Sequence, residues 1–324
     1  MKHTPQETAP GPDGPAVEVR NLTKTYPGGV EAVKGIDFDV APGEVFGLLG
    51  PNGAGKSTTI GMLTTTVSPT AGSAWVAGHD VANDPIAARG ASGVVFQDSV
   101  VDRALTGHHN LDIHARLWGV PRATAASRVA EFASTFGLAE ILDRPVGTYS
   151  GGQRRRLEIL RALLSEPAVL FLDEPTVGLD PRIRHELLDV IEELRSRAGM
   201  TILLTTHYLD EAERVCDRVA IVHEGRIVAL DSPHRMLSAL GPEVVELRVS
   251  HDPAGALLAM RNHGVAGDDA FAVGSTLTVP LQGRSGIEAI TSINGLGLTT
   301  SAITTRQPSL DDVYLRLTGT SLAA

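Results

Sequence analysis

The alternation of apolar and polar positions predicts several kinds of element along the chain. Residues 45–49 and 169–172 are short runs of almost only apolar side chains, typical of strands buried on both faces. Residues 16–20 and 36–40 alternate apolar with polar side chains, which predicts half-exposed antiparallel strands. Helical periodicity follows some of these strands, so the pattern indicates an α/β fold. Further strands are expected at 73–77, 93–96 and 201–205, and a hairpin at 218–222 and 227–230.

Helical patterns dominate the middle of the chain. Residues 106–142 are mostly helical in pattern, with a break at 119–121, and form an insertion between sheet elements. A helix is expected from Ser57, and another opens at Asp180, where Pro181 suits the first turn.

Residues 242–324 have a pattern of strands and helices of their own. Gly241 and Pro242 mark a boundary, after which we expect a small α/β domain. Its last helix begins at Ser309, with Asp312 completing a capping box. One apolar face of this helix is expected to dock on the preceding domain or on a second subunit; a domain with only a packing role is the alternative. The face consists of Leu310, Val313, Tyr314 and Leu317.

Composition narrows the class of protein. The length of 324 residues gives room for about two domains, and the net charge of −10 disfavours a chain that wraps nucleic acid. The single cysteine, Cys216, fits a reducing compartment. No apolar run approaches the ~20 residues that cross a bilayer, and residues 1–15 resemble a disordered tail, not a signal peptide. A soluble, cytoplasmic protein is expected. His108, His109 and His114 are expected at the surface.

The segment GPNGAGKST, residues 50–58, indicates a phosphate-binding loop. It fits G-x-x-x-x-G-K-[ST] and lies between a buried strand and a helix. Glycines let the backbone wrap a polyphosphate, and the helix N-terminus adds partial positive charge. The glycine spacing does not fit G-x-G-x-x-G, so a nucleoside triphosphate is favoured over NAD or FAD. The expected binding residues are Gly50, Pro51, Asn52, Gly53, Ala54, Gly55, Lys56, Ser57 and Thr58.

Two carboxylates and a histidine follow buried strands further along. Asp173 and Glu174 come directly after the strand at 169–172, where parallel strands present ligands. Asp173 would hold magnesium together with the Ser57 hydroxyl, and Glu174 is the natural general base for the attacking water. His207 follows the strand at 201–205, where it could sense a γ-phosphate; an ordinary loop residue is the alternative.

Three further features give weaker signals when each is taken alone. The segment YSGGQ, residues 149–153, opens a helix whose free amides suit a phosphate, but taken by itself it favours the alternative of an ordinary N-cap with a solvated basic first turn. Tyr26 is either a platform for adenine or an aromatic side chain packed on its own hairpin. Gln97 follows the strand at 93–96, and its position alone gives it no role.

Together and in order, these motifs resemble the full set of an ABC-type ATPase over residues 16–240. The phosphate loop, Gln97, YSGGQ, the strand ending in Asp173 and Glu174, Asp180 and His207 match its phosphate loop, Q-loop, signature, Walker B with catalytic glutamate, D-loop and switch histidine. The resemblance implies a P-loop NTPase with a mixed sheet core, an antiparallel β subdomain and a helical subdomain at about 98–165. Residues 242–324 would be an accessory domain.

Three segments resemble the daunorubicin-resistance type of ATP-binding subunit in drug exporters: TYSGGQRRRLE, LTGHHNLDIHARLWGV and PSLDDVYLRLTG. Tyr149 stands where most of the superfamily has leucine, as is common in this subgroup. His109 departs from the usual glutamate before Asn-Leu, in the helical region expected to face a membrane partner.

The resemblance also implies roles for individual residues. Tyr26 would stack on adenine. Ser57, Gln97 and Asp173 would hold Mg2+ directly or through water, while Glu174, His207 and Gln97 would serve catalysis. The signature would close over ATP held by the other subunit, so the ATP-bound unit would be a head-to-tail homodimer with Asp180 in its D-loop. The signature residues are Ser150, Gly151, Gly152 and Gln153.

The expected protein is the ATP-hydrolysing motor of an exporter for drug or antibiotic-like compounds, with ATP and Mg2+ as cofactors. Its partners would be a second copy and a separately encoded integral membrane permease, which would hold it at the inner face of the membrane, and no nucleic acid. The alternative is a soluble ABC ATPase of DNA repair or translation. That class predicts a long coiled coil or two cassettes in one chain, which this sequence lacks. A GTPase is disfavoured because the Asn-Lys-x-Asp motif is absent.

Overall fold

The computed structural model describes residues 14–281 and 283–320, and their contacts divide the chain into two compact units. The first unit contains the chain up to His207 together with Val215–Ile227, and the second contains Tyr208–Arg214 and the chain from Val228. The domain boundary expected at Gly241 and Pro242 therefore stays a prediction. Residues 1–13 of the expected tail lie outside the described residues.

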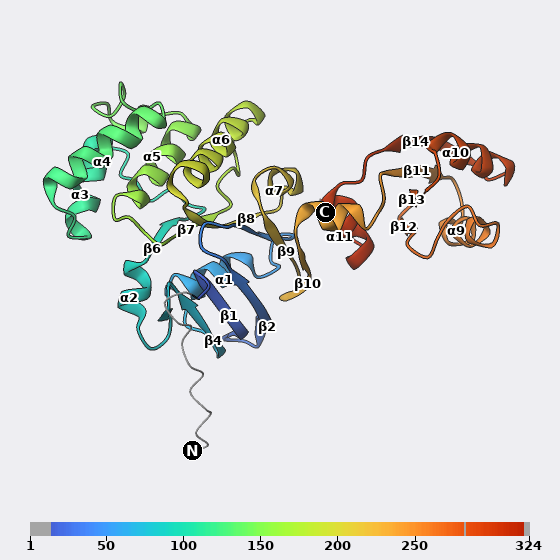
Figure 1. Ribbon diagram of the computed structural model, residues 1–324, viewed down its shortest axis with the longest axis horizontal. Coiled ribbons are helices and arrows are strands. Elements are labelled where there is room, and N and C mark those ends of the chain that lie inside the picture. Colours follow the sequence, from blue (N-terminus) through green and yellow to red (C-terminus); the bar gives the residue numbers. More distant parts are fainter. Residues whose placement is uncertain (1–13, 282, 321–324) are drawn as a thin grey trace, which may run out of the picture. The chain divides into compact units, whose positions relative to one another are not determined.

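A six-stranded sheet has the order β10-β9-β3-β8-β7-β6 (Figure 1), and its strands β9, β3, β8, β7 and β6 belong to the first unit. Strands β6, β7, β8, β3 and β9 pair in parallel, and every residue of β3, β7 and β8 is buried. Burial on both faces explains why these strands appear as continuous apolar runs in the sequence. The bounds are β3 (Val45–Leu49), β6 (Ser92–Val95), β7 (Val169–Asp173), β8 (Thr201–Thr206), β9 (Arg218–His223) and β10 (Arg226–Asp231).

A second, four-stranded sheet of this unit has the order β2-β1-β4-β5 and is antiparallel. On β2, Ile36 and Phe38 are buried while Asp37 and Asp39 are exposed. The predicted half-exposed antiparallel strands are therefore confirmed. The bounds are β1 (Val17–Tyr26), β2 (Val30–Val40), β4 (Ala71–Val76) and β5 (His79–Asp80).

The helices of the first unit begin and end close to the predicted positions. Helix α3 ends at Leu117 and α4 begins at Arg122, on either side of the expected break. Figure 1 shows both, in green, grouped with α5, against which they pack. Asp180 caps α6 by accepting the Ile183 amide at 3.1 Å. The bounds are α1 (Lys56–Leu63), α2 (Pro85–Gly90), α3 (Gly107–Leu117), α4 (Arg122–Thr135), α5 (Gly151–Leu163) and α6 (Pro181–Ala198), with a 3-10 turn at Val146–Thr148.

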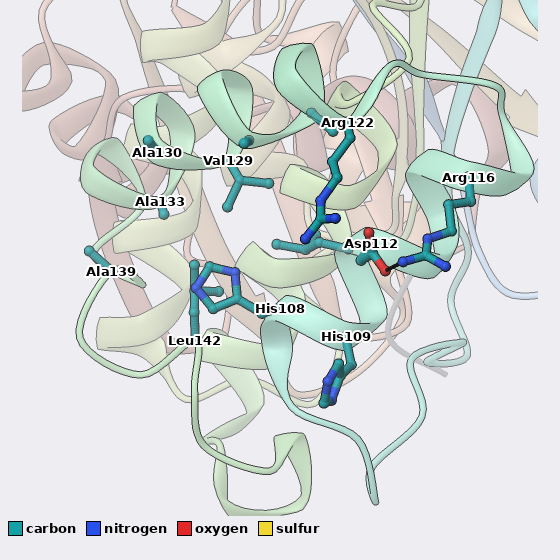
Figure 2. A pocket seen from close by; sticks show the side chains of 13 residues that line it. His108, His109, Asp112, Arg116, Arg122, Val129, Ala130, Ala133, Ala139 and Leu142 are labelled. Atoms are coloured by element: carbon teal, nitrogen blue, oxygen red, sulfur yellow. Dashed lines mark ion pairs between the residues drawn. The ribbon is translucent and has the colours of Figure 1, made fainter.

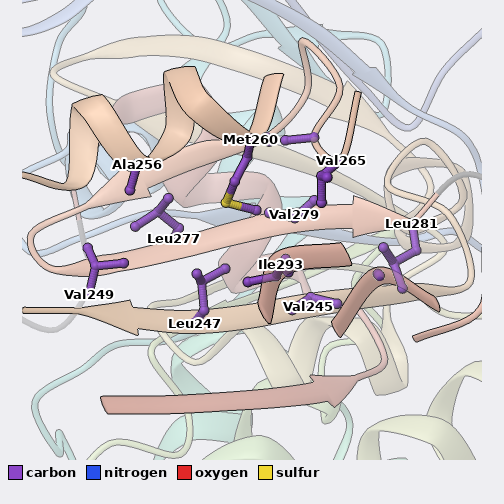
Figure 3. Close-up of a cluster of buried hydrophobic side chains, with 13 residues drawn as sticks. Val245, Leu247, Val249, Ala256, Met260, Val265, Leu277, Val279, Leu281 and Ile293 are labelled. Carbon is purple, nitrogen blue, oxygen red and sulfur yellow. The ribbon is translucent and has the colours of Figure 1, made fainter. Parts of the chain in front are cut away.

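The second unit contains a four-stranded antiparallel sheet with the order β12-β13-β11-β14. Figure 3 shows Met260 of α9 and Ile293 of α10 packed with buried side chains such as Leu247 and Leu277 from the sheet. The bounds are β11 (Glu243–Val249), α9 (Pro253–Asn262), β12 (Phe271–Val273), β13 (Thr276–Leu281), α10 (Gly286–Gly295) and β14 (Thr300–Arg306).

The same unit contains α7 (Leu209–Val215), α8 (Pro233–Ser238) and α11 (Leu310–Thr318). Helix α11 packs against α8, and the Leu310 amide donates to Glu213 Oε1 of α7 at 2.6 Å. Asp312 accepts the Ser309 amide at 2.9 Å, as the predicted capping box requires. Leu317, which was expected on the apolar face, is 45% exposed, so the buried face is one residue shorter than predicted. Among the described residues, no helix is long and apolar enough to cross a membrane.

Candidate functional site

Glycines fix the shape of the loop between β3 and α1. Gly50, Gly53 and Gly55 have φ angles of 153°, 81° and 106°, which L side chains rarely adopt. A Cβ on Gly55 would also lie 2.4 Å from the carbonyl oxygen of Ala32. Because Gly55 is the N-cap of α1, no side chain caps the first amides of this helix. These amides and the positive end of the helix dipole suit an anionic ligand.

The Lys56 side chain is buried inside this loop. Its Nζ donates to the carbonyl oxygens of Gly50 at 2.7 Å and Pro51 at 3.0 Å. The same nitrogen lies 3.2 Å from Glu174 Oε1, at the end of β7. The structure therefore brings together a cation and a carboxylate that the sequence separates widely.

Ser57 and Asp173 meet in the same region. The Ser57 hydroxyl donates to Asp173 Oδ1 at 3.1 Å, and the Thr205 hydroxyl donates to the same oxygen at 2.6 Å. A hydroxyl and a carboxylate are the hard oxygen ligands that Mg2+ prefers, alongside water and phosphate oxygens. This pair of side chains therefore fits a magnesium ion.

Glu174 is buried and has an unusual backbone. Its φ is 45°, in the left-handed region that non-glycine residues avoid and that is enriched at functional sites. His207 Nδ1 lies 3.5 Å from Glu174 Oε1. One carboxylate oxygen thus faces both the Lys56 ammonium and the imidazole.

The signature residues begin α5 with a capping box. The Gln153 amide donates to Ser150 Oγ at 3.2 Å, and the Ser150 amide donates to Gln153 Oε1 at 2.9 Å. A Cβ on Gly152 would lie 2.2 Å from Ile183 Cγ2, so this glycine lets α5 start against α6. In the part of the chain that the structure describes, no hydrogen bond or ion pair joins Ser150–Gln153 to Gly50–Thr58. The N-cap geometry is present, and a phosphate-binding role stays a prediction.

The remaining predicted residues occupy the surroundings. The Tyr26 hydroxyl lies 3.4 Å from Thr58 Oγ1, and the Lys24 ammonium lies 5.1 Å from the centre of the Tyr26 ring. Tyr26 is thus next to the phosphate loop as well as packed within its own strand pair. Gln97 is exposed beyond β6, and Asp180 is exposed at the start of α6.

Sequence reasoning missed Arg155, which lies in an arginine run and was given no role. Its guanidinium donates to the carbonyl oxygens of Asp173 and Pro175, both at 2.9 Å, and to that of Phe96. It also pairs with Glu158 Oε2 at 3.0 Å. Burial lowers the pKa of Arg155, while Glu158 acts in the opposite direction. One signal was available: Arg155 lies on the same helix face as the apolar Ile159.

A cavity of about 710 Å³ lies between α3 and α4 (Figure 2). Figure 2 shows Val129 and Ala133 on one side and His108 and Leu142 on the other. An Asp112–Arg116 ion pair of 2.6 Å adds charge at its edge. None of the predicted nucleotide-binding residues lines this cavity.

The histidines of α3 differ in environment. His108 and His109 are exposed, as expected. His114 is not a surface residue, because it is partly buried, with its ring edge-on to Trp118. Burial and the nearby Arg161 lower the pKa of His114 to about 4. Its imidazole is therefore neutral at physiological pH.

Comparison with known proteins gives consistent results. Residues 33–177 match the ABC transporter family. The chain is 43% identical over 311 residues to the daunorubicin/doxorubicin resistance ATP-binding protein DrrA of Streptomyces peucetius, covering 94% of this chain and 92% of that protein. It is 39% identical over 311 residues to the Nod factor export ATP-binding protein I of Burkholderia orbicola, covering 94% and 97%.

A solved dimeric ATP-binding cassette, in a post-hydrolysis state with ADP and Pi, is 25% identical with a TM-score of 0.60. The match covers 67% of this chain and 98% of that one. The predicted fold class is confirmed. The two relatives carry resistance and export names, which do not support the alternative of a DNA repair or translation ATPase.

Proposed function

The chain belongs to the ABC transporter family and is an ATP-hydrolysing subunit of the drug-resistance exporter type. We propose which of its residues bind ATP and catalyse its hydrolysis. One observation carries the proposal. Lys56, Ser57, Asp173, Glu174 and His207 follow three parallel buried strands, and each has a polar atom within 3.5 Å of another member. This cluster combines the groups that phosphoryl transfer needs: a cation, metal ligands and a base.

ATP binds through the phosphate loop. The uncapped amides at the start of α1 and the Lys56 ammonium face the phosphates, and residues 50–58 wrap them. Tyr26 stacks on the adenine, which is supported by the contact of its hydroxyl with Thr58. Lys56 must then exchange loop carbonyls and Glu174 for phosphate oxygens.

Ser57 and Asp173 would hold Mg2+, and Gln97 would contribute through water. When bound, the ion neutralises charge on the phosphates and fixes their geometry. Thr205 orients Asp173 by donating to the same carboxylate oxygen that Ser57 reaches. The hydrogen bonds from the Thr205 and Ser57 hydroxyls to Asp173 support the assignment of Ser57 and Asp173 as metal ligands.

Glu174 accepts a proton from the attacking water, and His207 orients this carboxylate and stabilises charge on the transferred phosphoryl group. The buried position of Glu174 strengthens its electrostatic interactions. Fixed dipoles and cations contribute most of the stabilisation, since the transition state spreads charge over phosphate oxygens.

The active form is a head-to-tail homodimer. Residues Ser150–Gln153 would contact ATP bound to the other copy, and Asp180 would lie in the interface. Support comes from the dimeric state of the solved cassette with ADP and Pi. The exposure of Ser150 and Asp180 is compatible with an intermolecular role.

The partner is a separately encoded integral membrane permease, which holds the chain at the cytoplasmic face of the membrane. Exposed apolar side chains on and after α3, namely Ile113, Leu117 and Trp118, suit such a contact. The cargo is a drug or antibiotic-like compound, and nucleic acid is not a partner. The resistance name of the Streptomyces relative supports the class of cargo.

Export in cells tests this function. The chain and its proposed permease partner would be expressed in a drug-sensitive host, and accumulation of a fluorescent anthracycline would be measured. Asp173→Asn should raise accumulation to the level of cells without the chain, whereas Asp268→Asn, at an exposed position in the second unit, should not. Equal export by Asp173→Asn and the unaltered chain would contradict the proposal.

A further inference from the structure

Hydrogen bonds hold the strained backbone of Glu174 on both sides. Its amide donates to Thr205 Oγ1 at 2.9 Å. The carbonyl groups of the two flanking residues, Asp173 and Pro175, both accept from the guanidinium of Arg155 at 2.9 Å. Because φ of Glu174 is 45°, these bonds oppose relaxation to a more common conformation.

The same arginine holds the segment around Gln97. Its NH1 donates to the carbonyl oxygen of Phe96, directly before Gln97. Glu158, the ion-pair partner of Arg155, accepts the hydroxyl of Ser99, two residues after Gln97. One ion pair on α5 therefore contacts the residues that flank both Gln97 and Glu174.

The burial of Arg155 and Glu158 indicates that the pair positions the segments that it contacts. Arg155 is 7% exposed and Glu158 is 2% exposed. Burying two charges costs desolvation that their attraction offsets only with good geometry, and apolar replacements are often neutral or stabilising. An arginine fits the arrangement because its planar group sends donors in several fixed directions, which a lysine ammonium does not.

We propose that Arg155, oriented by Glu158, is a positioning residue for ATP hydrolysis that ties the loop at Gln97 to the backbone of Glu174. A displacement of that loop is then transmitted to the orientation of the general base. The proposal rests on the role of Glu174 proposed above.

The first test separates ATP binding from turnover. Arg155→Met should lower kcat by about 10²-fold, the scale of a misplaced catalytic group. The KM for ATP should stay within about twofold, because Arg155 does not contact the phosphate loop. Arg155→Lys should fall between that variant and the unaltered protein, since it restores charge without the planar fork.

Arg156→Lys is the matched control. Arg156 is the next residue on α5, and its guanidinium contacts Glu186 and the Phe136 carbonyl instead. Its substitution should leave kcat within about twofold of the unaltered protein, since a conservative change that spares the catalytic geometry loses little transition-state stabilisation.

The second test separates positioning from packing. In Arg155→Met/Glu158→Leu no buried charge is left unpaired, so thermal stability should recover relative to Arg155→Met. We expect kcat to stay low in this double variant. Recovery of kcat together with stability would overturn the proposal, as would a near-normal kcat in Arg155→Met.

Glu174→Gln, measured in the same series, distinguishes the general-base role of Glu174 from the positioning role of Arg155. Normal turnover in Glu174→Gln would refute the general base itself. Loss of turnover in Glu174→Gln, with normal turnover in the Arg155 variants, would refute only the positioning role.

Discussion

Lys56 Nζ lies 3.2 Å from Glu174 Oε1, and both side chains are buried. Each group is the counter-ion of the other. In the proposed mechanism the phosphates of ATP compete with Glu174 for Lys56, and phosphate binding releases the carboxylate toward the attacking water. ATP binding and activation of the base would thus be linked through one ion pair.

Lys56→Ala should weaken ATP binding. A hydrogen bond to a charged group contributes about 1.5–3 kcal/mol, so Kd should rise by about 10- to 100-fold. Titration with a fluorescent ATP analogue measures this change. Lys34→Ala, which lies outside the site, is the control and should bind normally. An unchanged Kd in Lys56→Ala would remove this lysine from the phosphate site.

Glu174→Gln should become dimeric when ATP is added and return to the monomer when ATP is removed, because slow turnover preserves the closed state. Sedimentation velocity measures this. The double variant Lys56→Ala/Glu174→Gln should dimerise only at higher ATP concentration. A monomer at saturating ATP, with the permease present, would contradict the head-to-tail arrangement.

His114 should make folding stability depend on pH. Its folded-state pKa of about 4 lies below the ordinary value of 6.5, so the unfolded chain binds this proton more readily. Above pH 6.5 the imidazole is neutral in both states and imposes no penalty, whereas between pH 6.5 and 4 protonation of the unfolded chain lowers the free energy of unfolding. Between those values the urea midpoint should fall more in the unaltered protein than in His114→Gln. Parallel curves would show that His114 does not titrate in this way.

Deleting Pro308 to Ala324 should weaken export more than nucleotide binding. Leu310 of α11 donates to Glu213 of α7, and α7 begins two residues after His207 along the chain. Drug accumulation and ATP affinity would be compared at matched expression with the permease present. Equal resistance from the truncated and full-length chains would show that α11 has only a packing role.

Much of the fold and of the site follows from local signals. Strands β3 and β7 are recognisable because burial on both faces demands continuous apolar residues. Asp180 and Pro181 predict the start of α6, and the spacing from Gly50 to Ser57 predicts the phosphate loop. In each case the residues that make the structure are neighbours in the sequence.

Other features depend on distant contacts and left no such signal. Strand β14 has the sequence TSAITTR, lies at the edge of its sheet and is mostly exposed, so it lacks an apolar alternation. Arg155 looks like part of a solvated basic turn until the fold brings Phe96 and Pro175 to it. The partial burial of His114 likewise depends on the packing around α3.

Steady-state ATP hydrolysis by Glu174→Gln, with Mg2+ and saturating ATP, tests the central claim most directly. The substitution keeps the shape of the side chain but removes its ability to accept a proton. We predict that turnover falls by about 10²-fold or more, the usual contribution of a positioned base, while ATP binding is retained. Near-normal turnover would show that Glu174 is not the general base.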